Sequence, residues 1–174
     1  MKNLFLYLLL VVTFICKVEA QDCSFLEQEK GFRDIVLGAS IKDYPKFSMR
    51  NDSNIDLFKY YPNADYVYIG SETDKIKSIP ILYIYLITEN GRIKEINVVT
   101  QRIISLFSIL EAAYGEPDVS GNRYEWKSKS VWCIGIGDGN PRPGYLIIYK
   151  NTSDAWREVM ELKEKVSVEA QKEL

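Results

Sequence analysis

The 174-residue sequence contains no histidine and only three cysteines. Histidine is the most frequent general base at neutral pH and the most frequent metal ligand. Its absence excludes a serine hydrolase of the usual kind and leaves any cysteine nucleophile without an imidazole partner. Two or three sulfurs without histidine are also too few for an ordinary zinc site. We therefore expect no metal, no cofactor and no catalytic residue of these classes.

An excess of basic residues and a phosphate-binding loop are missing as well. The formal net charge is −2, and acidic and basic residues are interspersed along the chain, which argues against a nucleic-acid partner. Gly135, Gly137 and Gly139 follow an apolar segment, but no helical pattern follows them, as a phosphate loop would require. Asp138-Gly139-Asn140 begins like a calcium loop and lacks the later oxygen ligands. We interpret the glycines as positions that permit a β-bulge or close packing, and Asp138-Gly139-Asn140 as a turn.

The N-terminus has the pattern of a secretory signal. Lys2 precedes an apolar run from Leu4 to Cys16, and the segment ends in Ala20. The run is shorter than the roughly 20 residues that a membrane-spanning helix needs. We predict that residues 1–20 are cleaved and that residues 21–174 form a single soluble domain. The expected location is the periplasm or the extracellular space, with no stable membrane anchor.

Export leaves two cysteines in the mature chain, Cys23 and Cys133. Thiols in these compartments are usually oxidised, so we predict a disulfide between the two. Such a bridge closes a long loop, for which the chain-entropy model gives about 4–5 kcal/mol. The alternative is two separate thiols, one near a frayed terminus and one buried in a strand.

The first half of the mature chain predicts short elements separated by turns. We expect strands where β-branched and aromatic residues cluster, and loops where Asn, Asp, Ser and Pro accumulate. Ser40 to Asp43 favours a single helical turn limited by Pro45. The expected strands are 32–37, 56–61 and 66–69, with a loop over 46–55 and a polar connection over 73–78.

The clearest element is a hairpin formed by residues 79–88 and 93–100 around Asn90-Gly91. This dipeptide tolerates positive φ at both positions of a two-residue turn. A regular ladder from that turn places Tyr85 opposite Ile96 and Tyr83 opposite Val98. Both faces of the hairpin are apolar, which is typical of central strands with cover on both sides.

The second half predicts a helix after Thr100, because four apolar residues repeat at helical spacing up to Gly115. Strands 123–127, 131–137 and 145–149 follow, and a charged helix begins at Ser153. The expected fold is α+β, with a mainly antiparallel sheet covered by one principal helix and with a charged C-terminal helix. The stripe on the principal helix consists of Ile103, Phe107, Leu110 and Tyr114.

Tyrosines supply the candidate binding surface. Aromatic rows with hydroxyl groups suit the binding of sugars or proteins, and they equally suit a sheet that packs beneath a helix. The hairpin adds apolar residues that need either a helix or a partner over them. The candidate surface comprises Tyr66, Tyr68, Tyr83, Tyr85, Leu82, Ile84 and Leu86.

Carboxylates provide the one remaining route to catalysis, since two acids flanking a sugar can hydrolyse a glycosidic bond. Nothing in the spacing of the acidic residues selects a pair. The candidates are Glu89, Glu95, Glu111, Glu116 and Glu125.

Two pieces of the chain carry a family resemblance. The segment Phe32-Arg-Asp-Ile-Val-Leu-Gly-Ala-Ser40 and the later Tyr114-Gly-Glu-Pro117 and Tyr124-Glu-Trp126 are similar to a pattern in small exported bacterial proteins. The chain resembles the β-lactamase-inhibitor-like group, which includes a small outer-membrane assembly lipoprotein. This resemblance implies a protein-binding module of helix-covered antiparallel strands and transfers no functional residue. The chain departs from the group by lacking a lipidation motif and by a long tyrosine-rich insertion.

These observations predict an exported protein without catalytic activity that binds another exported or envelope protein, as an inhibitor or immunity factor. The alternative is a binder of a glycan or a small apolar ligand with a tyrosine-lined site. A carboxylate-dependent glycan hydrolase is the third hypothesis. The exposure of the hairpin face with Leu82, Ile84 and Leu86 distinguishes the protein-binding hypothesis from the ligand-binding one, because a buried face offers no docking surface for a protein.

Overall fold

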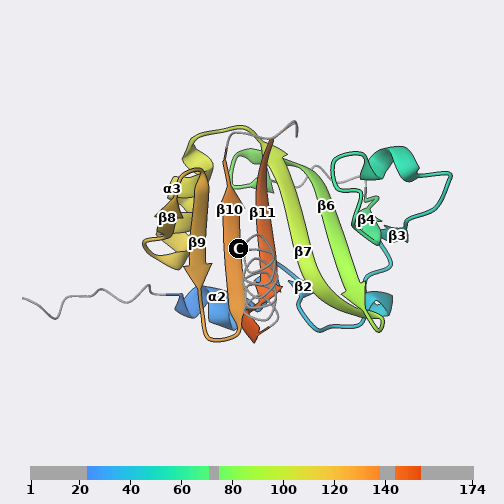
Figure 1. The fold of residues 1–174 in the computed structure, drawn as a ribbon, viewed down its shortest axis with the longest axis horizontal. Helices are drawn as coiled ribbons and strands as arrows, with labels where there is room; N and C mark the ends of the chain where they lie inside the picture. The colour runs from blue at the N-terminus through green and yellow to red at the C-terminus, as the bar shows by residue number, and fades with distance from the viewer. Residues whose placement is uncertain (1–22, 71–74, 138–143, 154–174) are drawn as a thin grey trace, which may run out of the picture.

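The computed structural model describes residues 23–70, 75–137 and 144–153 (Figure 1). The predicted signal peptide and almost all of the predicted C-terminal helix lie outside these residues. The described helices are α2 (Ser24–Glu29) and α3 (Ser105–Tyr114), with the 3₁₀ turns η1 (Ile41–Asp43) and η2 (Ile55–Phe58). The strands are β1 (Gly31–Phe32), β2 (Ile35–Val36), β3 (Phe47–Met49), β4 (Tyr66–Tyr68), β5 (Lys75–Ile76), β6 (Ile79–Glu89), β7 (Arg92–Gln101), β8 (Asp118–Ser120), β9 (Arg123–Lys127), β10 (Val131–Ile136) and β11 (Gly144–Asn151).

One antiparallel sheet organises the molecule. Its strands follow the order β3-β4-β6-β7-β11-β10-β9-β8, with β5 also paired to β6 and with β1 and β2 forming a separate hairpin. Every described pair is antiparallel. Long hairpins bring neighbouring strands together, as Figure 1 shows for β6 and β7. The predicted α+β class with a mainly antiparallel sheet is confirmed.

The first face of the sheet is covered by three elements. Leu26 of α2, Phe32 of the β1–β2 hairpin and Leu110 of α3 join one buried apolar cluster with sheet residues such as Ile96 and Ile147. The stripe on α3 is buried at Leu106, Leu110 and Tyr114, close to the predicted spacing. The cover is therefore shared by α2, α3 and the hairpin, whereas the sequence predicted one principal helix.

The second face of the sheet is apolar too. Phe58 of η2 and Tyr85, Trp132 and Ile148 of the sheet form a second buried cluster. Two buried faces explain why the hairpin strands read as nearly continuous apolar runs instead of alternating ones.

The register of the central hairpin differs from the prediction after its first pairs. Glu89 lies opposite Arg92 as expected, but Ile87 faces Glu95, because Lys94 is an extra residue in β7. This β-bulge moves the pairing from Glu95 to Val99 by one position, and a second shift at Leu82 in β6 restores the predicted register, so that Ile81 faces Thr100. Tyr85 consequently faces Asn97, and Tyr83 faces Val99.

Four other local expectations differ from the structure. The predicted strand 32–37 is the tight β1–β2 hairpin, which turns at Arg33 with φ +57°. The predicted strand 56–61 begins as the turn η2, and the predicted loop 46–55 contains β3. Helix α3 begins at Ser105, because Thr100 is still part of β7 and is fully buried.

The predicted disulfide is not present in the structure. Cys23 and Cys133 are both buried thiols of the first-face cluster and are not bonded to each other. The Cys23 thiol donates a hydrogen bond to the Tyr114 carbonyl oxygen at 3.3 Å. Burial raises the pKa of the Cys133 thiol far above its ordinary value. Both groups are therefore shielded from thiol reagents in the folded protein.

Titration of residues 21–174 with a thiol reagent should find almost no reactive thiol in the native protein at pH 8. Addition of denaturant without reductant should expose both Cys23 and Cys133, because burial is what protects them. A denatured protein that showed no reactive thiol before reduction would establish a bridge, contrary to this structure.

Candidate functional site

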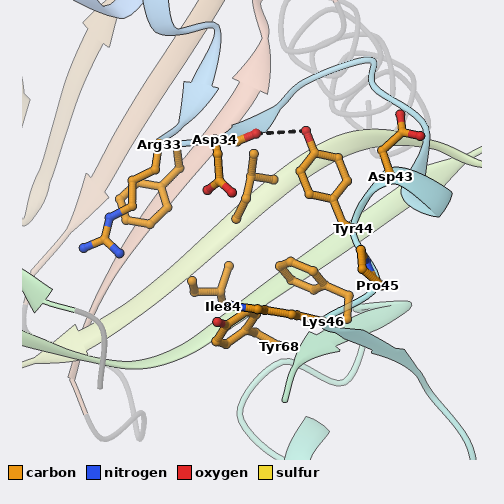
Figure 2. A pocket seen from close by; sticks show the side chains of 11 residues that line it. Arg33, Asp34, Asp43, Tyr44, Pro45, Lys46, Tyr68 and Ile84 are labelled. Carbon is orange, nitrogen blue, oxygen red and sulfur yellow. Dashed lines mark hydrogen bonds between the residues drawn. The ribbon is translucent and has the colours of Figure 1, made fainter. Parts of the chain in front are cut away.

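A cavity of about 280 Å³ lies at the edge of the first face. It is enclosed by the tip of the β1–β2 hairpin, by the segment from η1 to β3, and by strands β4 and β6 (Figure 2). Aromatic residues, aliphatic residues and four charged residues line it together. The lining consists of Phe32, Arg33, Asp34, Ile35, Asp43, Tyr44, Pro45, Lys46, Phe47, Tyr68 and Ile84.

Three aromatic rings form one wall of the cavity. Phe47 and Tyr68 are partners across β3 and β4, so both side chains project on the same face. Their ring centroids are 5.4 Å apart in an edge-to-face arrangement, and Tyr44 meets Phe47 in the same way at 6.4 Å. These geometries are the ones that aromatic quadrupoles favour, so the wall is held in place before any ligand arrives.

Tyr44 also fixes the mouth of the cavity. Its hydroxyl donates to the Asp34 carbonyl oxygen and accepts from the Val36 N–H, both at 3.0 Å. The first of these bonds is the dashed line in Figure 2. A single side chain from the η1 segment thereby holds the β1–β2 turn at a set distance from the sheet. The cavity exists because this distance leaves space between the β1–β2 turn and the sheet.

Charged groups surround the aromatic wall. In Figure 2 the Asp34 carboxylate points toward the centre of the cavity, and the Lys46 side chain extends alongside Tyr68. The Asp43 carboxylate points away from the centre. Arg33 donates to the Lys75 carbonyl oxygen and lies over the Phe32 ring at 5.2 Å, so its guanidinium braces the hairpin. One carboxylate and one ammonium group therefore offer polar contacts beside an apolar wall.

The structure divides the predicted tyrosine surface between the two faces of the sheet. Tyr68 and Ile84 line the cavity, and Tyr66 packs on the first-face core nearby. Tyr83 and Tyr85 lie on the second face, where their rings are stacked at 5.6 Å. The Tyr85 hydroxyl donates to the Leu57 carbonyl oxygen, and burial raises its pKa. These four tyrosines do not form one wall.

The apolar residues of the predicted surface are mainly core. Ile84 is 3% exposed and Leu86 is fully buried, whereas Leu82 is 39% exposed beside the second register shift in β6. The face that was expected to need either a helix or a partner is therefore covered within the chain at Ile84 and Leu86.

Sequence reasoning missed Asp34, Tyr44, Lys46 and Phe47. It assigned Lys46 and Phe47 to a loop, because Asn51 to Asn54 dominate that stretch. The alternation of Phe47, Ser48 and Met49 was the available signal for a strand. The turn at Arg33 had little signal, since arginine is not a usual residue for a left-handed position.

The acidic residues proposed for glycan hydrolysis are not brought together. Glu95 is buried beside Lys150. Glu125 is partly desolvated, yet hydrogen bonds and charges from Lys127 and Arg123 lower its pKa overall. Glu111 and Glu89 line two different cavities. None of the cavities described here holds two of the five glutamates.

Within residues 23–70, 75–137 and 144–153, no group of three or more acidic or cysteine side chains could hold a metal ion. No helix in the described part of the chain is long and apolar enough to cross a membrane. Comparisons with protein-family models, with curated proteins and with solved structures found no match to this chain, so the resemblance to the β-lactamase-inhibitor-like group stays a prediction.

Proposed function

We propose that the mature, exported chain is a binding module without catalytic activity, and that its ligand is a small molecule with an apolar face and hydroxyl groups, such as a sugar. The observation that carries the proposal is the cavity in which Tyr44, Phe47 and Tyr68 form a wall beside Asp34 and Lys46. A mostly apolar concave site with a few polar groups is typical of small-molecule binding.

The dimensions favour a ligand of one or two sugar rings. A cavity of about 280 Å³ lies at the small end of ligand sites. Aromatic rings offer a broad, rigid surface at a low cost in conformational entropy, which suits the apolar face of a pyranose. Asp34 can accept hydrogen bonds from ligand hydroxyls, and Lys46 can donate to ring or hydroxyl oxygens.

The site is also ordered in advance. Tyr44 holds the hairpin tip through two hydrogen bonds, and the strand pair β3–β4 fixes Phe47 against Tyr68. Little conformational freedom remains to be lost when a ligand binds, which lowers the cost of binding. The burial of Ile84 and Leu86 removes the argument for a protein partner over the hairpin, and this shifts our proposal to the small-ligand alternative.

The test is saturation-transfer-difference NMR followed by calorimetry of residues 21–174 with maltose, cellobiose and N,N′-diacetylchitobiose. At least one saccharide should bind to the wild-type protein. Tyr68→Leu should weaken that binding by about tenfold, because it removes the ring and keeps an apolar side chain of useful bulk.

Tyr60→Leu is the matched control. Its ring lies against Tyr83 at 5.7 Å on the opposite face, so its loss should leave saccharide binding unchanged. Equal weakening by the two substitutions, or no binding of any of the three saccharides to the wild-type protein, would count against the proposal.

A further inference from the structure

A second cavity, of about 310 Å³, lies on the other side of the β1–β2 hairpin, between α2, α3 and β5. Its walls are formed mainly by apolar side chains of the two helices, the hairpin and β5, including Phe25, Phe32, Ile76, Leu110 and Tyr114. Phe25 is 48% exposed at this site, although its ring stacks on Tyr114. An exposed large apolar side chain beside an apolar hollow is a feature of a ligand site.

Basic residues gather at the mouth of this cavity. Arg33, Lys75 and Lys77 line it, and among the described residues of the lining Glu29 is the one acidic residue. All three basic side chains belong to exposed residues. An apolar hollow with a predominantly cationic mouth complements a molecule that has an apolar tail and an anionic head.

The backbone at the mouth is unusual at two of these basic residues. Arg33 has φ +57° and Lys77 has φ +54°. Each lies in a two-residue hairpin turn, since Phe32 pairs with Ile35 and Ile76 pairs with Ile79. Glycine or asparagine is favoured at such positions, because a larger side chain there costs free energy. Two long cationic side chains therefore occupy turn positions at which glycine would fit the backbone with less strain. Residues with strained backbone conformations of this kind cluster at binding sites.

We propose that this cavity binds an anionic amphiphile of the medium-chain carboxylate class. The hydrocarbon tail lies against Phe25, Leu110 and Tyr114, and the carboxylate faces Lys75 and Lys77. Arg33 already holds the Lys75 carbonyl oxygen and keeps β5 next to the hairpin. The site is separate from the proposed saccharide site, since the two cavities share only Phe32 and Arg33.

The experiment is calorimetry of residues 21–174 with octanoate and, as the neutral counterpart, octan-1-ol. Octanoate should bind more tightly than octanol, and its affinity should fall as salt is added, because the head group is partly exposed. The double substitution Lys75→Gln and Lys77→Asn should weaken octanoate binding by about tenfold and leave octanol binding unchanged. Asparagine is chosen at position 77 because it tolerates the left-handed conformation.

Lys129→Gln is the control for charge alone, since Lys129 is an exposed lysine outside the cavity lining. It should leave octanoate binding unchanged. Ala113→Trp, on the cavity wall, should block binding of both probes. Three results would each overturn this proposal: octanol binding as tight as octanoate binding, an unchanged octanoate affinity in the double variant, or no octanoate binding by the wild-type protein. None of these results bears on the proposed saccharide site.

Discussion

Lys150→Met should lower the free energy of unfolding by about 3–5 kcal/mol, because it leaves the Glu95 carboxylate buried without its cation. The Lys150 ammonium lies 2.7 Å from Glu95 Oε2, and the Glu95 side chain is only 7% exposed. Tyr61 and Asn97 donate hydrogen bonds to Oε1 at 2.8 and 2.7 Å. These neutral donors cannot replace the lost charge. Denaturant unfolding followed by circular dichroism measures the change.

The double variant Glu95→Gln and Lys150→Met tests the cause. It removes both charges and keeps an acceptor oxygen for Tyr61 and Asn97, so it should recover most of the lost stability. Lys129→Met, at an exposed position, should change stability by no more than about 0.5 kcal/mol. A double variant as unstable as Lys150→Met would show that the packing of the lysine stem matters more than the buried charge.

Trp126→Ala should destabilise the protein by about 3–5 kcal/mol, since it opens a cavity in the first-face core. The Trp126 side chain is fully buried and is the largest residue among those with no exposure. Its ring meets Tyr114 edge-on at 6.0 Å, and its indole N–H donates to the Gly115 carbonyl oxygen at 2.8 Å. One side chain of β9 therefore holds the C-terminal end of α3 against the sheet.

Trp126→Phe separates the two contributions, because it keeps an aromatic ring and loses the hydrogen bond to Gly115. Its cost should be clearly smaller than that of Trp126→Ala. Val119→Ala in β8 is the exposed control, with an expected change within about 0.5 kcal/mol. Similar midpoints for Trp126→Ala and Val119→Ala would contradict the assignment of Trp126 to the core.

The long elements were predictable because each carries a local signal. Asn90-Gly91 marked the β6–β7 turn, and Gly115 marked the end of α3, where its φ is +82°. The bulge at Lys94 was harder to find. Ile93 and Ile96 have opposite parity in the sequence and yet both lie in the first-face core, which requires an extra residue between them. That conflict is visible in the sequence once both residues are known to be core.

The candidate site was predictable only in part. Tyr68 and Ile84 belonged to the predicted surface, because aromatic and β-branched residues mark strands. The rest of the wall comes from Tyr44 and Phe47, whose position depends on the pairing of β3 with β4. Pairing between short, distant segments leaves no periodic signal of its own. The split between Tyr68 and Tyr83 likewise follows from the pairing of β4 with β6, in which Val67 faces Tyr85 and Tyr66 faces Leu86.

The strands at the two edges of the sheet are much shorter than the strands in its middle. Strands β3 and β8 are the outermost strands of the described sheet and have 3 residues each, whereas β6 has 11 and β7 has 10. An unpaired strand edge is a template on which another chain can add by backbone hydrogen bonding, and very short edge strands limit that addition. The long, apolar strand β7 is paired along its length with β6 and β11, and the short strands β4 and β5 pair with part of the outer side of β6. The strand order thus reduces the length of apolar strand edge on which another copy could add through the backbone.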